Sequence, residues 1–285
     1  MHQIYTLFKE TIAEFRKHNI SQMAASLAYF GLFATAPIIL ITITLLNFFL
    51  SDLQIRYTLV NEVRSLAGPQ VSSTVQTVLQ NMAKNKGEHT IFEIVTVALL
   101  VVAATTLFIQ LQKILNELWD IKLNKPITFL KSIQTRFFSL IGIMVAGFAF
   151  YIFFVLSIAF NLLGSYIKTL TGYDSGMLQS INFVISFFFI IAVVTNIFKY
   201  IPNARISWKD AIVGGTITAS LLTMSRYFLT FYFSKSVVGS VYGTAGSLMV
   251  FLAWIYFSAL IFLFGVIFTR IHAEHIGDGI HPHKL

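Results

Sequence analysis

The sequence predicts an all-α membrane protein, a polytopic bundle of about six transmembrane helices that forms a single membrane domain over residues 1–285. Two observations support this fold class. Of the 285 residues, 56% are hydrophobic and only 11% are charged, and the mean hydropathy is +0.76. A soluble domain carries about a quarter charged residues, because its surface faces water. In addition, several stretches are long and apolar enough to cross a bilayer, which takes roughly 20 residues.

The predicted spans contain two formally charged residues, Glu93 and Arg226. If the N-terminus lies inside, the inside connections carry about twice as many Lys and Arg residues as the outside connections. Because positive residues collect on the cytoplasmic side, we expect both termini in the cytoplasm. The spans are predicted at 24–50, 91–112, 137–163, 180–198, 211–234 and 245–269.

Two amphipathic segments are predicted outside the spans. The first 20 residues place apolar side chains on one helical face, which indicates a helix on the cytoplasmic membrane surface. The charged residues within this segment do not fit a cleavable signal peptide. The first outer connection, residues 51–90, predicts two short amphipathic helices separated by a break. The residues that carry these patterns are Ile4, Phe8, Ile12 and Phe15 in the first segment, and Gly68-Pro69 followed by Val71, Val75, Val78 and Met82 in the second.

Arg226 is the most informative single residue, because it lies about two-thirds of the way through the fifth predicted span. An arginine near the bilayer centre costs roughly 2.5–3.5 kcal/mol on insertion scales, so another interaction must compensate. Either Arg226 binds the phosphate or carboxylate of an anionic lipid head group, or it forms a structural pair or reaches the outer head groups. Glu93 is the candidate partner within the membrane; otherwise it is a solvated interfacial charge.

A stripe of small and polar residues surrounds Arg226 on one face of the fifth span. Gly215 and Ala219 favour tight packing against a neighbouring helix. Thr223 and Thr230 are candidates for a polar track that lines a cavity ending at Arg226. The candidate anion or lipid head-group site is therefore Arg226, Thr223, Thr230 and Glu93.

Prolines and glycines mark candidate structural or hinge positions. Pro37 lies in the middle of the first span, so we expect a kink that acts either as a hinge or as a fixed shape. Pro202 precedes the fifth span, and Gly215 lies near its start. Tyr242 and Gly243 belong to a glycine-rich outer connection, which predicts a tight turn because it lacks the ending of a phosphate loop.

The sequence predicts no cofactor and no metal site. The chain has no cysteine, which excludes thiolate chemistry. His272 and His275 are about one helical turn apart, and they fall with His281 and His283 in a glycine-containing tail that lacks the rigidity of a catalytic zinc site. The net charge of +8 is explained by cytoplasmic loops and anionic head groups, so a nucleic-acid partner is not expected.

Several local patterns, in the same order and over nearly the whole chain, resemble the YihY/BrkB family of bacterial inner-membrane proteins, formerly labelled ribonuclease BN. One departure is visible: the family often has Gly-Ala-Glu near the end of the last span, and this chain has Gly265-Val266-Ile267. The resemblance implies a location in the bacterial inner membrane and a link to envelope maintenance. The matching residues are Ala24-Ala25-Ser26-Leu27-Ala28-Tyr29 and Pro37, Leu115-Asn116-Glu117-Leu118-Trp119, Tyr200-Ile201-Pro202-Asn203 with Trp208, Gly214-Gly215, and Val241-Tyr242-Gly243-Thr244-Ala245-Gly246 with Trp254.

Two functional hypotheses remain open at this point. The chain either transports or flips an anionic lipid or amphiphile, with membrane lipids as its partners, or it is a non-catalytic scaffold that recruits envelope proteins or forms a homo-oligomer. An enzyme is not expected. The nuclease suggested by the old family label needs a His-x-His-x-Asp-His element, which the sequence does not contain.

Overall fold

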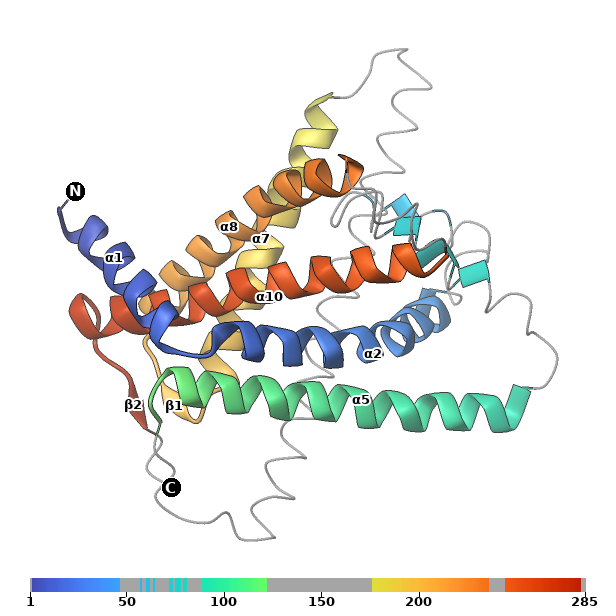
Figure 1. The fold of residues 1–285 in the computed structure, drawn as a ribbon, viewed down its shortest axis with the longest axis horizontal. Coiled ribbons are helices and arrows are strands. Elements are labelled where there is room, and N and C mark those ends of the chain that lie inside the picture. The colour runs from blue at the N-terminus through green and yellow to red at the C-terminus, as the bar shows by residue number, and fades with distance from the viewer. Residues whose placement is uncertain are drawn as a thin grey trace, which may run out of the picture. The chain divides into compact units, whose positions relative to one another are not determined.

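The structure of the protein, a computed structural model, describes residues 2–46, 89–121, 176–235 and 244–282, together with short helical pieces between residues 57 and 80. Side chains are described for a subset of these residues. Six long helices and a pair of short strands make up the principal elements of this part of the chain (Figure 1). They are α1 (His2–Lys17), α2 (Ile20–Leu46), α5 (His89–Leu118), α7 (Gly176–Tyr200), β1 (Ala204–Arg205), α8 (Trp208–Lys235), α10 (Thr244–His275) and β2 (His281–Pro282).

The prediction of a mainly helical chain is confirmed for the described residues. Helices α5, α7, α8 and α10 cover predicted spans, and α2 covers the described part of the span predicted at 24–50, whereas the span predicted at 137–163 lies outside the described residues. Within the described part, the segments Phe183–Tyr200 and Leu248–His275 are long and apolar enough to cross a membrane, judged by length and composition. A complete set of six spans stays a prediction.

The chain packs into two compact units, and each is made of segments that lie far apart in the sequence. Unit 1 contains Met1–Leu7, Leu115–Ser220 and Gly265–Leu285. Unit 2 contains Phe8–Ile114 and Leu221–Phe264. Helices α5, α8 and α10 therefore each contribute one part to each unit.

In unit 1, helices α8 and α10 meet through a reciprocal glycine–threonine contact. A Cβ atom on Gly214 would collide with the side chain of Thr269, and a Cβ atom on Gly265 would collide with the side chain of Thr218. Each threonine donates its hydroxyl hydrogen to the glycine carbonyl one turn earlier in its own helix, at 2.7 Å in both cases. Small residues allow helix backbones to approach closely, so this contact fixes the crossing of the two helices.

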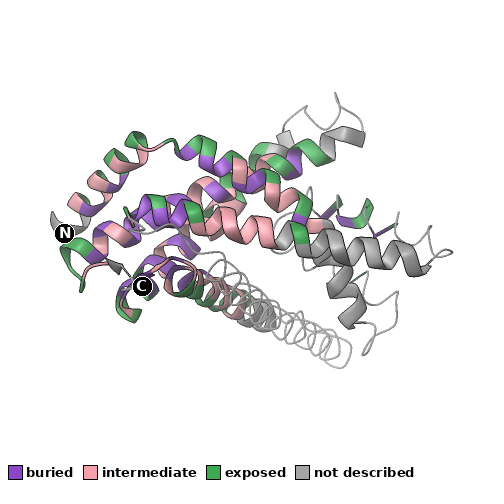
Figure 2. Cartoon of the chain, turned by 90° about the horizontal axis from the view of Figure 1, so that it is seen from below, coloured by how far each residue is buried: buried purple, intermediate pink, exposed green. Residues whose placement is uncertain are grey.

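The end of α10 extends unit 1 beyond the predicted span. The sixth span was predicted to end at residue 269, with His272 and His275 in a tail that is not rigid, but the helix continues to His275. His272 and His275 therefore lie in the helix and not in a non-rigid tail, because Ile271 and Ala273 are buried and extend the packed face of the helix by another turn. In Figure 2 buried positions alternate with intermediate and exposed ones along the described helices. A two-residue antiparallel pairing of β1 with β2 follows this turn, with Ala204 opposite Pro282.

In unit 2, the described contacts between helices include an apolar cluster and a polar link. Phe251 of α10 is buried and packs with three partly buried side chains, Leu32, Trp254 and Ile255. A hydrogen bond of 3.0 Å from Gln110 Nε2 to Ser26 Oγ links α5 to α2. Unit 2 therefore has an aromatic and aliphatic interior, with a local polar link between two of its helices.

Helix α1 turns part of its predicted apolar face toward the protein. The rings of Phe8 and Phe15 lie 6.2 and 5.9 Å from the ring of Phe264 in α10. Thr11 lies between them in the sequence and is fully buried. Ile12, which was predicted on the same face, is 46% exposed and lies outside this contact. The packed stripe of α1 therefore runs through Phe8, Thr11 and Phe15.

The first predicted hinge lies inside a continuous helix. Pro37 falls within α2, and the ribbon of α2 changes direction in its C-terminal half (Figure 1). In the segment 51–90, the described residues are helical, which agrees with the predicted amphipathic helices. Ser72, Val75 and Leu79 are buried at helical spacing. Of the residues that were predicted to carry the apolar face, Val75 is the one whose burial the structure describes.

Candidate functional site

A buried carboxylate and an imidazole meet in unit 1, where α8 begins and α10 ends. Asp210 lies in the first turn of α8, and its backbone N–H donates to Ser207 Oγ at 3.3 Å, as at the start of a capped helix. His272 lies in the last turn of α10, and its Nδ1 is 3.0 Å from Asp210 Oδ1. An acid near a helix N-terminus and a base near a helix C-terminus both complement the helix dipole. Local helix electrostatics therefore favour this pair at both of its ends.

The two members of the pair differ in their access to solvent. The side chain of Asp210 is 2% exposed, whereas that of His272 is 14% exposed. The imidazole ring of His272 lies near the ring of Phe268, one turn earlier, with 6.2 Å between the ring centres. His272 is therefore the more accessible end of the pair.

The Asp210 carboxylate is enclosed on one side by backbone. A Cβ atom on Gly277 would collide with both carboxylate oxygens, so only glycine fits against this carboxylate. The Gly277 N–H is held by the carbonyl of His272 at 3.2 Å. Among the described residues, Asp210 Oδ2 is buried and has no hydrogen-bond partner. Oδ1 of Asp210 thus accepts a hydrogen bond from the imidazole of His272, and Oδ2 has no hydrogen-bond donor among the described residues.

An ionic cluster joins the end of α5 to the end of α10. Arg270 contacts Asp120 Oδ2 at 2.6 Å, donates to the carbonyl of Leu118 at 2.9 Å and donates to Glu274 Oε1 at 2.8 Å. Asp120 has a positive φ of 50°, and Ile121 N–H bonds to the Asn116 carbonyl at 2.9 Å. These features form a left-handed helix end of the Schellman type, in which Asp replaces the usual glycine. The helix end of α5 is thereby fixed against α10.

The Asn-x-x-Trp element places two more hydrogen bonds in unit 1. Asn116 Oδ1 accepts from the backbone N–H of Asn203 at 2.9 Å, and Trp119 Nε1 donates to the carbonyl of Val266 at 3.0 Å. Both Asn116 and Trp119 are buried. Pro202, a predicted structural position, is also buried in this turn before α8. The resemblance motifs at residues 115–119 and 200–203 therefore meet in the structure.

Arg226 lies apart from this network, in the segment of α8 that belongs to unit 2. Its side chain is half-buried, and its guanidinium carbon lies 5.3 Å from the ring centre of Tyr227. No acidic side chain that the structure describes forms an ion pair with Arg226. Three aromatic side chains close to it in the sequence are largely exposed: Tyr227 (59%), Phe228 (68%) and Phe231 (60%). The arginine therefore lies among exposed aromatic side chains.

The other predicted site residues have different outcomes. Thr223 and Thr230 are half-buried in the same segment of α8 as Arg226. Glu93 lies in α5, and its side chain is outside the described set, so pairing with Arg226 stays a prediction. Gly215 is buried against α7, where a Cβ atom would collide with the hydroxyl of Thr195, which supports its role in tight packing. Tyr242 and Gly243 lie outside the described residues.

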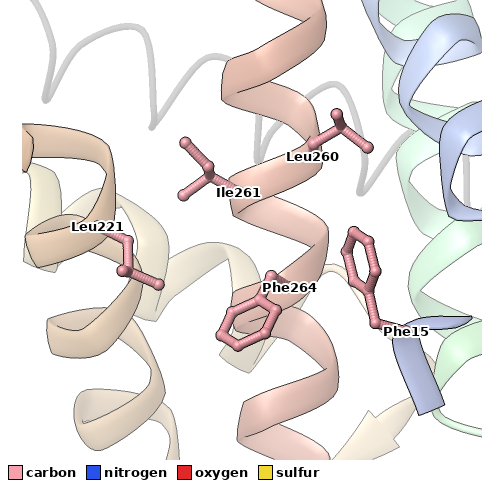
Figure 3. A pocket seen from close by; sticks show the side chains of 5 residues that line it. All are labelled: Phe15, Leu221, Leu260, Ile261 and Phe264. Atoms are coloured by element: carbon pink, nitrogen blue, oxygen red, sulfur yellow. The ribbon is translucent and has the colours of Figure 1, made fainter. Parts of the chain in front are cut away.

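Unit 2 also contains an apolar cavity that is wide open to the surface and has a volume of about 290 Å³. Figure 3 shows Leu221 of α8 on one side of α10 and Phe15 of α1 on the other. Between them lie three residues of α10, namely Leu260, Ile261 and Phe264. All five lining side chains are hydrocarbon, so the cavity suits an alkyl chain.

Sequence reasoning missed the Asp210–His272 pair and the Arg270 cluster. The spacing of Ser207 and Asp210 was a usable signal, because it matches the start of a capped helix. The contact with His272 is separated by 62 residues in the sequence, and no local pattern indicates it. Within the described residues, no group of three or more metal-ligating side chains is assembled.

Segments of α7 and α10 that are apolar and long enough to cross a membrane indicate a helical membrane protein. The comparisons identify its family: the chain matches the family described as Virulence factor BrkB over residues 11–284. It belongs to this family, as the resemblance of its motifs indicated. No solved structure matches the chain.

Three relatives illustrate the range of similarity, and each is named a UPF0761 membrane protein. The chain is 24% identical to the protein from Janthinobacterium sp. (strain Marseille), over 94% of the chain and 59% of the relative. It is 25% identical to the protein from Pseudoalteromonas atlantica, over 90% of the chain and 82% of the relative. It is 27% identical to the protein from Psychrobacter sp. (strain PRwf-1), over 93% of the chain and 48% of the relative. The chain thus spans about half to four-fifths of the length of these relatives.

Proposed function

We propose that this protein binds an anionic amphiphile within the bacterial inner membrane and moves it between the leaflets. The guanidinium of Arg226 binds the phosphate or carboxylate of the head group, and the apolar cavity holds part of the alkyl chain. The protein acts as a transporter and not as an enzyme. Both termini lie in the cytoplasm in this arrangement.

The observation that carries the proposal is the environment of Arg226. This cation is half-buried in a long helix of a membrane protein, and no described acidic side chain pairs with it. A charge in such a position costs free energy unless a counter-charge compensates. A guanidinium matches phosphate and carboxylate oxygens with two parallel hydrogen bonds, so an anionic head group supplies the missing partner.

The cavity supports an amphiphile over a small inorganic anion. Leu221 lines the cavity and lies five residues before Arg226 on the same helix. Five residues correspond to roughly 7.5 Å along a helix axis. Leu221 and Arg226 point about 140° apart around that axis, so Arg226 does not line the interior of the cavity. Its long side chain is instead placed to reach the rim of the cavity. An amphiphile with its charge at Arg226 and its chain against Leu221 and Phe264 satisfies both features.

The experiment is a transfer assay with purified protein in liposomes. Vesicles would carry a head-group-labelled phosphatidylglycerol or, separately, a labelled phosphatidylcholine, and exchange between leaflets would be followed by quenching of the outer label. We expect transfer of the anionic lipid to exceed that of the zwitterionic lipid. Arg226→Ala should abolish this preference, and Arg226→Lys should restore it only in part, since an ammonium lacks the planar fork.

Arg16→Ala provides the matched control. Arg16 is an exposed arginine on α1, and its loss should leave anionic transfer unchanged. Equal transfer by wild type and Arg226→Ala would refute the role of Arg226. Absence of transfer for both lipids would refute the transport proposal and favour a scaffold that recruits other envelope proteins.

A further inference from the structure

We propose that the connection between α7 and α8 is a binding surface for the head groups of anionic phospholipids. Four side chains form this α7–α8 surface: Lys199 and Tyr200 at the end of α7, and Trp208 and Lys209 at the start of α8. The surface belongs to unit 1, whereas Arg226 belongs to unit 2. The proposal therefore does not rest on the proposed transport.

Two aromatic rings lie at the end of a segment that can cross a membrane. The segment Phe183–Tyr200 is long and apolar enough to do so, and Tyr200 is its last residue. The rings of Tyr200 and Trp208 meet edge to face, with 6.0 Å between their centres. Their side chains are 67% and 48% exposed. Because Tyr and Trp concentrate where hydrocarbon meets head groups, this pair marks the level of the membrane surface.

A lysine ammonium lies beside these rings. Lys199 Nζ is 5.5 Å from the ring centre of Trp208 and donates one hydrogen bond to the carbonyl of Ile206. An ammonium has three N–H donors, so two remain after this bond. No described acidic side chain forms an ion pair with Lys199. A phosphate oxygen of a lipid head group can accept the remaining hydrogen bonds.

The charge around these rings has a single sign. Residues 199–209 contain three basic residues and no acidic residue. Arg205 and Lys209 are exposed, and neither forms an ion pair with a described acidic side chain. The next residue, Asp210, is buried and bonded to His272, so it does not present a negative charge at the surface. Basic side chains close to a membrane favour anionic over zwitterionic head groups.

The next turn of α8 shows why a bilayer lipid fits better than a soluble acidic partner. Ile212 and Val213 lie one turn after Trp208 and Lys209, on the same face of the helix, and both are exposed. Basic and aromatic side chains followed by aliphatic ones repeat the order of a bilayer from head groups to hydrocarbon. A soluble acidic partner would match the lysines and leave the aliphatic side chains uncovered. In the predicted topology the surface faces the cytoplasmic leaflet.

The experiment uses the fluorescence of Trp208. The chain has three tryptophans, so Trp119→Phe together with Trp254→Phe leaves Trp208 as the single fluorophore. This full-length protein would be placed in vesicles of phosphatidylglycerol and phosphatidylcholine in equal amounts. One of the two lipids would carry bromine near the carbonyl end of its chains, which quenches a nearby indole. We expect stronger quenching when the phosphatidylglycerol is brominated.

The two lysines should account for this preference. Each basic residue near the membrane surface contributes about fivefold to the relative affinity. Lys199→Gln combined with Lys209→Gln should therefore make the two brominated lipids quench equally. Lys9→Gln is the matched control, because Lys9 is an exposed lysine of unit 2, and its loss should leave the preference unchanged. If the double variant does not fold, Lys209→Gln alone should lower the preference by about fivefold.

Three results would overturn the proposal. The first is equal quenching by the two lipids before any lysine is changed. The second is a preference for phosphatidylglycerol that survives both lysine substitutions. The third is loss of the preference in an excess of soluble glycerol phosphate, because the surface would then bind a free phosphate and not a membrane lipid. If the protein with Trp208 alone does not fold, the difference in quenching between wild type and Trp208→Phe gives the same comparison.

Discussion

The two units join their helices by different kinds of contact. Unit 1 uses buried polar groups, in which Trp119, Asn116 and the Asp210–His272 pair each bond to a neighbouring element. Unit 2 relies on aromatic and aliphatic packing around Phe251 and Phe264, with a hydrogen bond from Gln110 to Ser26 as a polar link. Hydrogen bonds have fixed directions and apolar contacts do not. The described contacts of unit 1 therefore restrict the relative directions of its helices more than the described apolar contacts of unit 2 do.

The largest loss of stability is expected when the imidazole of His272 in unit 1 is removed. His272→Ala leaves the Asp210 carboxylate buried without its partner, and breaking a buried pair in this way costs about 3–5 kcal/mol. Thermal unfolding in detergent should show a large loss of stability. His275→Ala, on the same helix, should change stability by no more than about 0.5 kcal/mol. Equal effects of the two substitutions would contradict the structural importance of the pair.

The next largest effect concerns the glycine–threonine contact. Gly265→Ala places a methyl group against the Thr218 side chain, and overpacking of this kind costs about 1–3 kcal/mol. Thr218→Gly in the same chain removes the obstacle. The double variant should therefore unfold at a higher temperature than Gly265→Ala alone. Failure of this rescue would show that the loss has another origin.

A smaller effect is expected for a single hydrogen bond. Trp119→Phe keeps an aromatic ring near Phe198 but removes the donor to the Val266 carbonyl. The loss should be about 0.5–1.5 kcal/mol, the usual net value of one such bond. Chemical denaturation of both proteins in the same detergent would measure it. A neutral or stabilising substitution would mean that this bond does not hold α5 to α10.

The smallest effect on stability is expected in unit 2. Arg226→Gln removes a charge that has no acidic partner among the described side chains, so stability should change by no more than about 0.5 kcal/mol. Anionic lipid transfer should nevertheless fall toward that of Arg226→Ala. Unfolding and transfer measured on one preparation would separate the two outcomes. A strongly destabilised Arg226→Gln would assign Arg226 a structural role.

Much of the fold follows from the sequence because composition and helical periodicity are local properties. The helices α7 and α10 contain long apolar runs, and both lie where spans were predicted. The end of α10 was missed because polar residues such as Arg270 and His272 resemble the start of a tail, although Ile271 and Ala273 keep the helix packed. Ile12 is exposed while Phe8 and Phe15 contact Phe264, since periodicity places residues on a broad face but does not determine which of them pack against the protein.

The candidate functional residues also fall into those that the sequence indicates and those that only the structure reveals. Arg226 was singled out because a charge within an apolar run is visible in the sequence alone, and its role in a site stays a prediction. Asp210 and His272 lie outside the predicted spans and look like ordinary loop charges until the helices are in place. Their partnership spans 62 residues, so it depends on the tertiary packing of α8 against α10. Local patterns identify unusual residues, whereas contacts between distant elements need the structure.

The glycine–threonine contact in unit 1 has a consequence for assembly within the lipid. Both hydroxyls are satisfied inside their own helices, so no hydrogen bond crosses from α8 to α10 at these four residues. Parting the helices at this point would expose no unpaired donor or acceptor to hydrocarbon, where such a group is costly. At these four residues the two helices are held by shape alone, whereas the Asp210–His272 contact joins them nearer the end of α10. Helices α8 and α10 can therefore form and break this glycine–threonine contact reversibly while the chain is still being assembled.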